Sequence, residues 1–246
     1  NFKNLFIKRG INTLALQQDD LRPTRVVLVR RDADGERSFE GFEGDKGLGF
    51  ADQAISLEKI IKDWPLVIDN AKWLVIGTIP LASEISSRAF LWCIENALDA
   101  GIKIVLDLNW RPTFWRNQFS RVSAPSLQEK NTITSILNNV SLIKLAREEA
   151  DWFFNTSNPS EISSSLSNKP SVIVTDGSNP ILWLLNNHIG KSFAISPPSI
   201  VDTTGAGDSF TAGLIYKLLS IELDQISKER AEEIIQFATA CGAHVC

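Results

Sequence analysis

The chain has 246 residues, of which 43% are hydrophobic, 9% aromatic and 22% charged, and its net charge is −4. This composition is typical of a globular protein with a sizeable core. A weakly negative chain without a Lys/Arg run is a poor partner for nucleic acid or anionic membranes, no apolar run approaches the ~20 residues that span a bilayer, and no signal peptide opens the sequence.

The first part of the chain contains a predicted β-hairpin over residues 22–42. Residues 24–30 are rich in β-branched side chains, and Asp34-Gly35 is a strong turn signal. Glycines then accumulate between Gly41 and Gly49, before a short helix expected near residues 56–63. The hairpin could be a lid over a ligand site or an ordinary edge hairpin.

From residue 72 onward, strands and helices alternate. Strands are predicted at residues 73–77, 102–107, 141–144, 171–175, 181–185 and 192–195, with a turn at Gly190. Helices are predicted at residues 83–100, 128–138, 147–153, 210–219 and 229–242, and residues 157–169 are interpreted as a surface helix or loop. This order predicts an α/β fold with a mostly parallel sheet, whose ligands bind beyond the carboxyl ends of the strands.

The most informative segment is residues 201–210, Val-Asp-Thr-Thr-Gly-Ala-Gly-Asp-Ser-Phe, which opens an apolar helical run. Gly205 and Gly207 can adopt backbone angles closed to other residues. Their N–H groups can then converge on an anion at a helix N-terminus. Asp208 places a carboxylate beside that anion, which suits a base that takes a proton from a hydroxyl attacking a phosphoryl group. The alternative interpretation is that Asp208 only caps the helix.

This segment closely resembles the C-terminal signature of the PfkB, or ribokinase-like, carbohydrate kinases. The resemblance implies a three-layer α/β sandwich with a small β lid, over a single domain at 1–246. It also implies an ATP- and Mg²⁺-dependent kinase in which Asp208 is the catalytic base and the backbone of Gly205, Ala206 and Gly207 forms the anion hole.

Two further segments resemble this family. In Asp107-Leu-Asn109-Trp-Arg111-Pro, the resemblance implies that Asn109 and Arg111 face the substrate, although Arg111 could be a surface residue before a proline. In residues 144–149, Glu149 matches the Glu of the family's Asn-x-x-Glu motif, which acts through water on Mg²⁺. Here Ala146 replaces the Asn, and Glu149 could equally serve the helix dipole. Lys144 is expected to face the nucleotide phosphates.

The remaining candidate residues concern the nucleotide and a monovalent cation. Thr175 and Gly177 resemble the family's strand and turn before the nucleotide region, although an ordinary Asp-Gly turn would contain the same residues. Asp202 and Thr204 are candidates for holding a monovalent cation such as K⁺, as in some relatives.

The cysteines indicate a reducing compartment, and the histidines give no sign of a catalytic or metal-binding motif. Cys93, Cys241 and Cys246 have no metal-ligand or redox spacing, so we expect reduced thiols and a cytoplasmic location. His188 and His244 lack a partner motif and are interpreted as structural, which disfavours Ser-His-Asp and histidine–metal chemistry.

Within the family, residues 22–39 and 107–115 resemble the fructokinase branch. Alternative acceptors are 2-keto-3-deoxygluconate, ribose or a nucleoside, and another alternative is a kinase-like protein that binds a partner without catalysis. The sequence contains no methionine, and both ends look truncated, so the family's N-terminal sugar-binding and C-terminal adenine-binding segments are expected to be missing. By analogy with lids of relatives, the strand 25–29 could pair across a homodimer.

Overall fold

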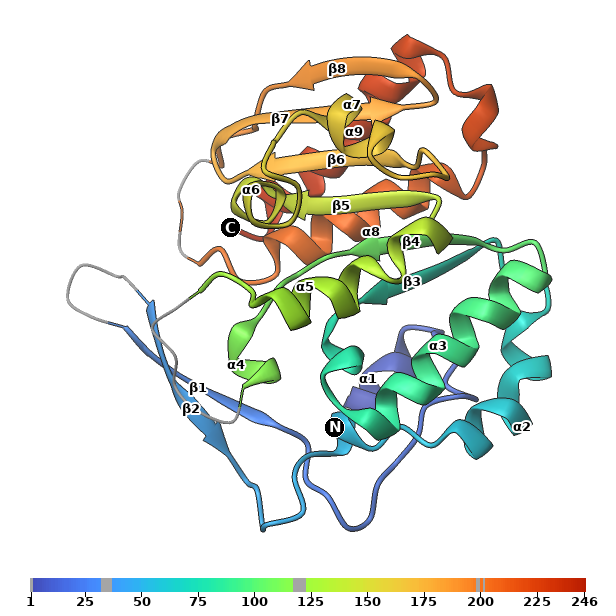
Figure 1. Cartoon of the computed structure of the whole chain (residues 1–246), viewed down its shortest axis with the longest axis vertical. Helices are drawn as coiled ribbons and strands as arrows, with labels where there is room; N and C mark the ends of the chain where they lie inside the picture. Colours follow the sequence, from blue (N-terminus) through green and yellow to red (C-terminus); the bar gives the residue numbers. More distant parts are fainter. Residues whose placement is uncertain (1, 32–36, 117–122, 198–199, 201) are drawn as a thin grey trace. The chain divides into compact units, whose positions relative to one another are not determined.

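The computed structural model describes residues 2–31, 37–116, 123–197, 200 and 202–246. The chain forms two compact units, coloured along the sequence in Figure 1. The first contains residues 1–71, 79–96 and 112–121, and the second contains residues 72–78, 97–111 and 122–246.

The second unit is built on a six-stranded sheet in the order β3-β4-β5-β6-β7-β8. Strands β3 to β6 run parallel, and β7 and β8 are antiparallel additions at one edge. The strands are β3 (Trp73–Gly77), β4 (Lys103–Asp107), β5 (Leu142–Ala146), β6 (Ser171–Asp176), β7 (Asn179–Leu185) and β8 (His188–Ser192). The predicted α/β class with a mostly parallel sheet is therefore confirmed.

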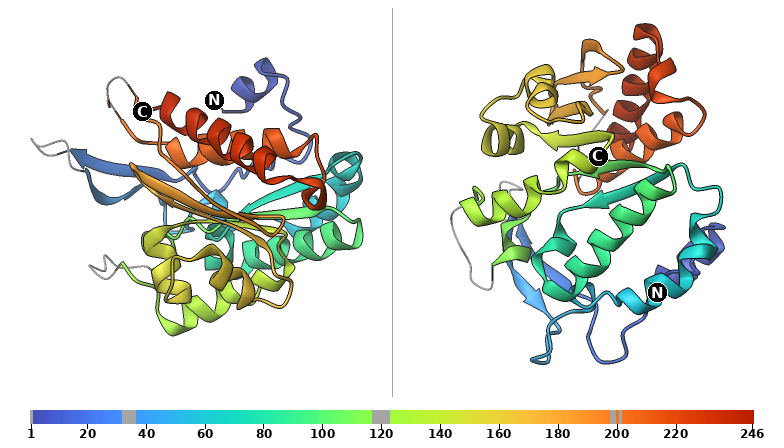
Figure 2. Two further views of the ribbon diagram at one scale, coloured as in Figure 1. Left: turned by 90° about the horizontal axis from the view of Figure 1, so that it is seen from above. Right: turned by 45° about the vertical axis from the view of Figure 1, so that its right-hand side comes forward.

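Helices cover both faces of this sheet (Figure 2). Helices α6 and α7 contact β5, β6 and β7, while α8 and α9 pack against each other and α9 contacts β8. The helices of this unit are α5 (Leu127–Thr134), α6 (Arg147–Phe154), α7 (Pro159–Ser164), α8 (Ala206–Leu218) and α9 (Lys228–His244), with short 3₁₀ turns η3 (Leu137–Asn139) and η4 (Leu223–Gln225). The expected deep packing of α8 is confirmed by the burial of Phe210, Leu214 and Leu218.

One predicted strand boundary is wrong. Gly190 was expected to form a turn before a strand at 192–195, but it lies inside β8. The turn is made by Asn186 and Asn187, with φ of 45° and 63°, because asparagine tolerates left-handed backbone better than most residues. Gly190 serves packing instead: a Cβ at this position would lie 1.9 Å from the Trp183 indole, which is fully buried.

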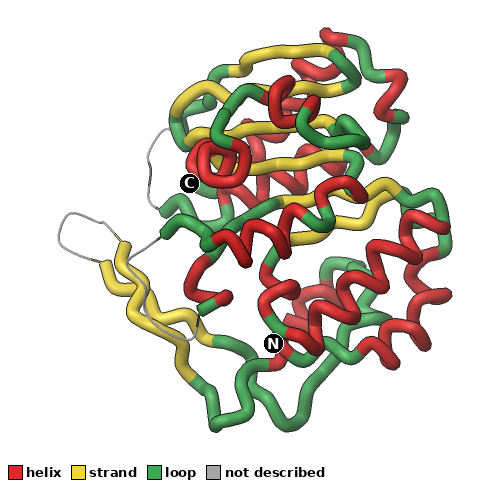
Figure 3. Tube along the Cα trace, viewed as in Figure 1, coloured by secondary structure: helices red, strands yellow, loops and turns green. Residues whose placement is uncertain are grey.

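The first unit consists mainly of helices and a two-stranded antiparallel sheet, as the tube in Figure 3 shows by colour. Its elements are α1 (Phe2–Lys8), β1 (Val26–Arg31), β2 (Arg37–Glu43), η1 (Ala51–Gln53), α2 (Leu57–Ile68), η2 (Ile79–Ala82), most of α3 (Glu84–Asp99) and α4 (Pro112–Trp115). The predicted hairpin is confirmed by the pairing of β1 with β2, whereas its expected turn at Asp34-Gly35 lies outside the described residues.

An arginine whose side chain is only 8% exposed fixes the base of the hairpin. The Arg25 guanidinium lies 4.4 to 4.6 Å from the ring centroids of Phe42, Phe50 and Phe114. It also pairs with Asp52 at 2.8 Å. Cation–π contacts gain strength when the cation is withdrawn from water, so this cluster is a strong anchor for β1 and β2.

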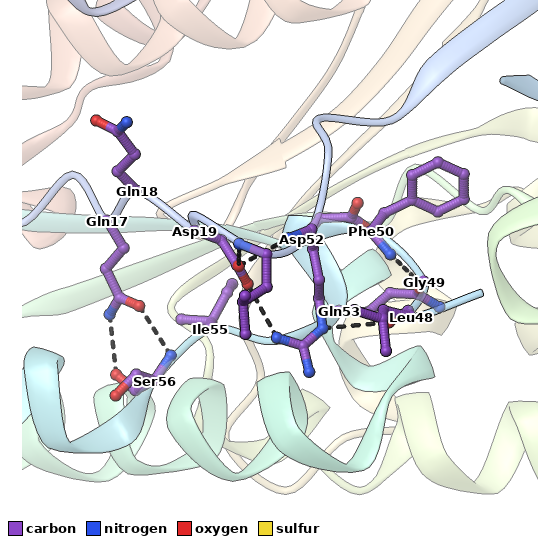
Figure 4. Close-up of polar contacts among 12 residues, drawn as sticks. Gln17, Gln18, Asp19, Leu48, Gly49, Phe50, Asp52, Gln53, Ile55 and Ser56 are labelled. Carbon is purple, nitrogen blue, oxygen red and sulfur yellow. Dashed lines mark hydrogen bonds and ion pairs between the residues drawn. The ribbon is translucent and has the colours of Figure 1, made fainter. Parts of the chain in front are cut away.

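The loop before β1 is braced by side chains that replace regular backbone pairing (Figure 4). Gln17 bonds both the N–H and the C=O of Ser56, at 2.8 and 2.9 Å. Asp19 accepts the N–H groups of Leu21 and Arg22, which together with the Arg22 side chain hold its pKa below the usual value. These bonds satisfy polar groups of an irregular segment.

Within the described residues, no helix has the length and apolar character needed to cross a bilayer.

Replacement of Gly190 by Ala should destabilise the second unit. The added methyl group must displace the Trp183 indole, and overpacking of this kind costs about 1–3 kcal/mol or more. Urea denaturation measures the loss. Gly77→Ala is the control, since a Cβ there meets only the Asp107 carbonyl oxygen at an ordinary 3.6 Å. Equal stability of the two variants would contradict the packing interpretation.

Candidate active site

The main-chain N–H groups at the N-terminus of α8 form the first part of the candidate site. Gly205 is the residue before the helix, and its φ of 84° is a conformation that glycine adopts readily. The N–H of Ala206 donates to the Thr203 carbonyl at 3.2 Å. In the described part of the chain, the N–H groups of Gly205, Gly207 and Asp208 have no acceptor. Free N–H groups at the positive end of a helix dipole favour an anion.

The Asp208 carboxylate lies beside these N–H groups, in the first turn of α8, and is exposed. It lines a pocket of about 530 Å³ together with Asn109, so the structure brings these two predicted residues together. The pocket is lined by Val75, Ile76, Gly77, Asp107, Asn109, Asp208, Thr211, Ala212, Ile215, Tyr216 and Leu219. An exposed carboxylate at a pocket edge can accept a proton from a bound hydroxyl.

The loop after β4 carries the other predicted substrate residues. Asn109 has a left-handed φ of 44°, a sparsely populated conformation that often accompanies functional sites. Arg111 is exposed, and its Nη1 donates to the Trp110 carbonyl oxygen at 3.0 Å. Arg111 does not line the pocket that contains Asn109 and Asp208.

Lys144 is buried beneath the glycine loop. Its Nζ lies 3.1 and 2.9 Å from the two carboxylate oxygens of Asp107, and both residues have less than 10% of their surface exposed. A Cβ on Gly207 would lie only 3.2 Å from the same Nζ. The absence of a side chain at Gly207 therefore lets the Lys144 ammonium approach the first turn of α8.

Glu149 is also buried, and both of its carboxylate oxygens accept main-chain hydrogen bonds. Oε1 accepts the Trp110 N–H at 2.6 Å, and Oε2 accepts the Ala146 N–H at 2.7 Å. Burial raises the pKa of Glu149, while these two N–H donors act in the opposite direction. Glu149 thus ties the loop after β4 to the end of β5.

The other predicted residues lie outside the pocket. The Thr175 hydroxyl donates to the Leu145 carbonyl at 3.5 Å, and Gly177 forms the turn between β6 and β7 with φ of 54°. Asp202 accepts the Thr204 N–H at 2.7 Å, which makes a local turn before α8. Within the described residues, no three His, Cys, Asp or Glu side chains gather as a metal site.

Asp107 and Thr211 are site residues that the sequence motifs do not predict. The Thr211 hydroxyl lies 2.9 Å from Asp107 Oδ2, so both residues belong to the network around Lys144. The sequence contains two signals: Asp107 is the polar last residue of a strand and follows the apolar residues 104–106, and Thr211 is a polar residue one helical turn after Gly207 in an apolar run.

Curated relatives resemble nearly the whole chain. Probable fructokinase-5 of Arabidopsis thaliana is 29% identical over 99% of this chain and 71% of the relative. The fructokinase of Vibrio alginolyticus is 27% identical over 98% of this chain and 73% of the relative.

Solved structures share the ribokinase-like fold. Fructokinase from Xylella fastidiosa with bound ATP gives a TM-score of 0.77 at 20% identity, over 98% of this chain and 72% of that one. Fructokinase from Vibrio cholerae in its fructose, ADP and calcium ion bound form gives 0.73 at 22% identity, over 98% and 73%. Aminoimidazole riboside kinase from Salmonella enterica, complexed with aminoimidazole riboside and an ATP analog, gives 0.72 at 20% identity, over 98% and 73%. The family model of the pfkB family carbohydrate kinases matches residues 1–246, and the chain belongs to this family.

Proposed function

We propose that the protein phosphorylates a hydroxymethyl group of a sugar with ATP, as a fructokinase-like kinase. The observation that carries the proposal is the juxtaposition of free N–H groups at the start of α8 with the exposed Asp208 carboxylate and the Lys144 ammonium. An anion hole beside a base is the arrangement that phosphoryl transfer to an alcohol requires.

The proposed reaction needs one proton transfer and one displacement. Asp208 takes the proton of the acceptor hydroxyl, whose oxygen forms a bond to the γ-phosphorus while the bond from that phosphorus to the ADP oxygen breaks. The N–H groups of Gly205, Gly207 and Asp208 hold the transferred phosphoryl group. Asn109 and Arg111 are proposed to bind the acceptor, and Thr175 and Gly177 the nucleotide.

Mg²⁺ fits this chain as an ion that arrives with the nucleotide. Magnesium keeps several waters and takes substrate phosphates plus one or two carboxylates as ligands, so it needs no dedicated protein cage. Such an ion would supply positive charge to the phosphates. Glu149 is proposed to act on it through water, since both of its oxygens accept main-chain N–H groups. Asp202 is proposed to contribute to a K⁺ site near the anion hole.

Fructose is the favoured acceptor because the relatives described above are named fructokinases. A riboside is the second candidate, supported by the shared fold with aminoimidazole riboside kinase. A cytoplasmic location is proposed from the cysteine spacing, which forms no disulfide framework.

The test is ADP release with ATP and Mg²⁺ against fructose, glucose, ribose, 2-keto-3-deoxygluconate and adenosine. We expect turnover on fructose, and a loss of about 10²- to 10⁴-fold in kcat for Asp208→Asn because the base is removed. Asp151→Asn, an exposed aspartate on α6, is the control. Near-normal turnover by Asp208→Asn would refute its role as base. Tight ATP binding without turnover on any acceptor would favour the partner-binding alternative.

Glu149→Gln should raise the Mg²⁺ concentration needed for half-maximal turnover and also lower stability. The amide nitrogen of Gln would face one of two main-chain N–H groups, which leaves a buried donor unsatisfied at a cost of about 1–3 kcal/mol. Magnesium titration and urea denaturation measure the two effects. Glu148→Gln, on the exposed face of α6, is the control. A loss of stability without any change in magnesium requirement would leave Glu149 a purely structural role.

The hairpin is proposed to pair with a second copy of the chain. Val26, Val27, Leu28 and Val29 are consecutive and 38–52% exposed, and among the described residues β1 pairs with β2 alone. An exposed apolar strand with a free edge favours association.

Sedimentation should therefore give a dimer, and Val27→Lys combined with Val29→Lys should convert it to monomer, because the charges oppose burial of the strand. Ile189→Lys, at a 60% exposed position on β8, is the matched control. A monomeric wild-type protein, or a dimer that survives the double substitution, would contradict this surface.

A further inference from the structure

We propose that Asp107 and Thr211 are positioning residues for the phosphate site: they hold the Lys144 ammonium against the first turn of α8, where it donates to the phosphoryl group. This inference rests on the proposed function, because it assigns residues to the same site. The Asp107 carboxylate makes three contacts, two with Lys144 and one with Thr211.

The first observation is that Asp107 and Lys144 are neighbours by strand register. Asp107 ends β4, and it is directly paired with Lys144 of β5 in the parallel ladder. Their side chains are 12% and 10% exposed, so the ion pair is largely withdrawn from water. Burying two charges is expensive and is often no more stabilising than apolar packing. A stability role alone is therefore a weak reason for this pair.

The second observation is the unused donor of Lys144. An ammonium has three hydrogens. Asp107 has two oxygens within reach, at 3.1 and 2.9 Å, and no other acceptor of Lys144 lies in the described part of the chain. Gly207 lies beside the same Nζ, since a Cβ on this glycine would be 3.2 Å away. The remaining hydrogen is thus available beside the free N–H groups of Gly207 and Asp208.

The third observation is that Thr211 connects the same carboxylate to α8. Its Oγ1 lies 2.9 Å from Asp107 Oδ2 and 3.0 Å from the Gly207 carbonyl oxygen. A hydroxyl carries one hydrogen, and bonds to a carboxylate are the stronger ones. Donation to Asp107 is therefore favoured. The carboxylate then joins β4, β5 and the helix that carries the anion-binding N–H groups.

The charges of Asp107 and Lys144 distinguish two roles for the pair: orienting the ammonium, or attracting phosphate by net positive charge. Asp107 neutralises Lys144, so a Lys144 that acted only through its charge would attract phosphate more strongly without Asp107. If Asp107 instead aims the ammonium, its loss should impair catalysis, since small misplacements in a site can cost up to about 10²-fold. The two roles thus predict opposite effects of one substitution.

The experiment compares kcat and the KM for ATP of Asp107→Asn, Thr211→Val and Thr211→Ser with those of the wild type. We expect kcat to fall about 10- to 100-fold in Asp107→Asn, to fall in Thr211→Val, and to recover in Thr211→Ser, which retains the hydroxyl. The KM for ATP should change less than kcat. Glu222→Gln is the control, because Glu222 pairs with Lys103 at the opposite end of β4. Unchanged or higher kcat in Asp107→Asn would overturn the proposal.

A double-mutant cycle tests whether Asp107 acts through Lys144. The pair Asp107→Asn/Lys144→Met should lose no more kcat than Lys144→Met alone, and additive losses would overturn the proposal. Because Lys144→Met leaves a buried carboxylate unpaired, it could fail to fold. If Lys144→Met does not fold, the double variant, which lacks the unpaired charge, is compared with Asp107→Asn. Its kcat should equal or lie below that of Asp107→Asn, and a higher kcat would overturn the proposal.

Calorimetric titration with ATP and with inorganic phosphate separates this inference from the proposed function. A wild type that binds both but phosphorylates none of the acceptors would refute the kinase activity alone. Weaker phosphate binding by Thr211→Val than by Thr211→Ser would still support positioning. Equal binding by those two variants, or no binding of either probe by the wild type, would overturn it.

Discussion

The arrangement of the site depends on the hydrogen bonds of one carboxylate, that of Asp107. This carboxylate is reached by the Lys144 ammonium from β5 and by the Thr211 hydroxyl from α8, while Asp107 itself ends β4. Three elements that are distant in the sequence are therefore held by one charged group. In a parallel sheet the carboxyl ends of adjacent strands share an edge, so register alone suffices to bring Asp107 and Lys144 together.

Three carboxylates in and around the site differ in burial and in hydrogen-bond partners. Asp107 is neutralised by Lys144. Glu149 is buried and occupied by the N–H groups of Trp110 and Ala146, and its pKa is raised by burial. Asp208 is exposed at the pocket. Within the described residues, Asp107 and Glu149 use their carboxylate oxygens in buried hydrogen bonds, whereas Asp208 has none there. These environments support the proposal that Asp208 acts as the base, while Glu149 holds the backbone and Asp107 holds the Lys144 ammonium.

The sheet, the hairpin and α8 could be predicted from the sequence because each depends on a local pattern. Apolar runs mark β3 to β6, and the glycines before Asp208 mark the start of α8. The packing role of Gly190 depends on Trp183 of the neighbouring strand, so no local pattern in the sequence predicts it. The roles of Asp107 and Thr211 are not predicted by local patterns either, because Asp107 lies 37 positions from Lys144 and 104 positions from Thr211 in the sequence. Side-chain networks require strand register, and register was not available from one sequence.

The two glycines of the loop meet different physical requirements. Gly205 has a φ of 84°, and a Cβ there would meet nothing within 4 Å, so its constraint is the path of the backbone. Gly207 lies in the helix, and its constraint is the Lys144 Nζ at 3.2 Å from a would-be Cβ. A side chain at Gly205 would therefore alter the direction of the N–H groups, whereas one at Gly207 would displace the ammonium and leave the helix intact. In the proposed anion site, Gly205 sets the direction of the main-chain N–H groups and Gly207 leaves room for the Lys144 ammonium, which Asp107 holds nearby.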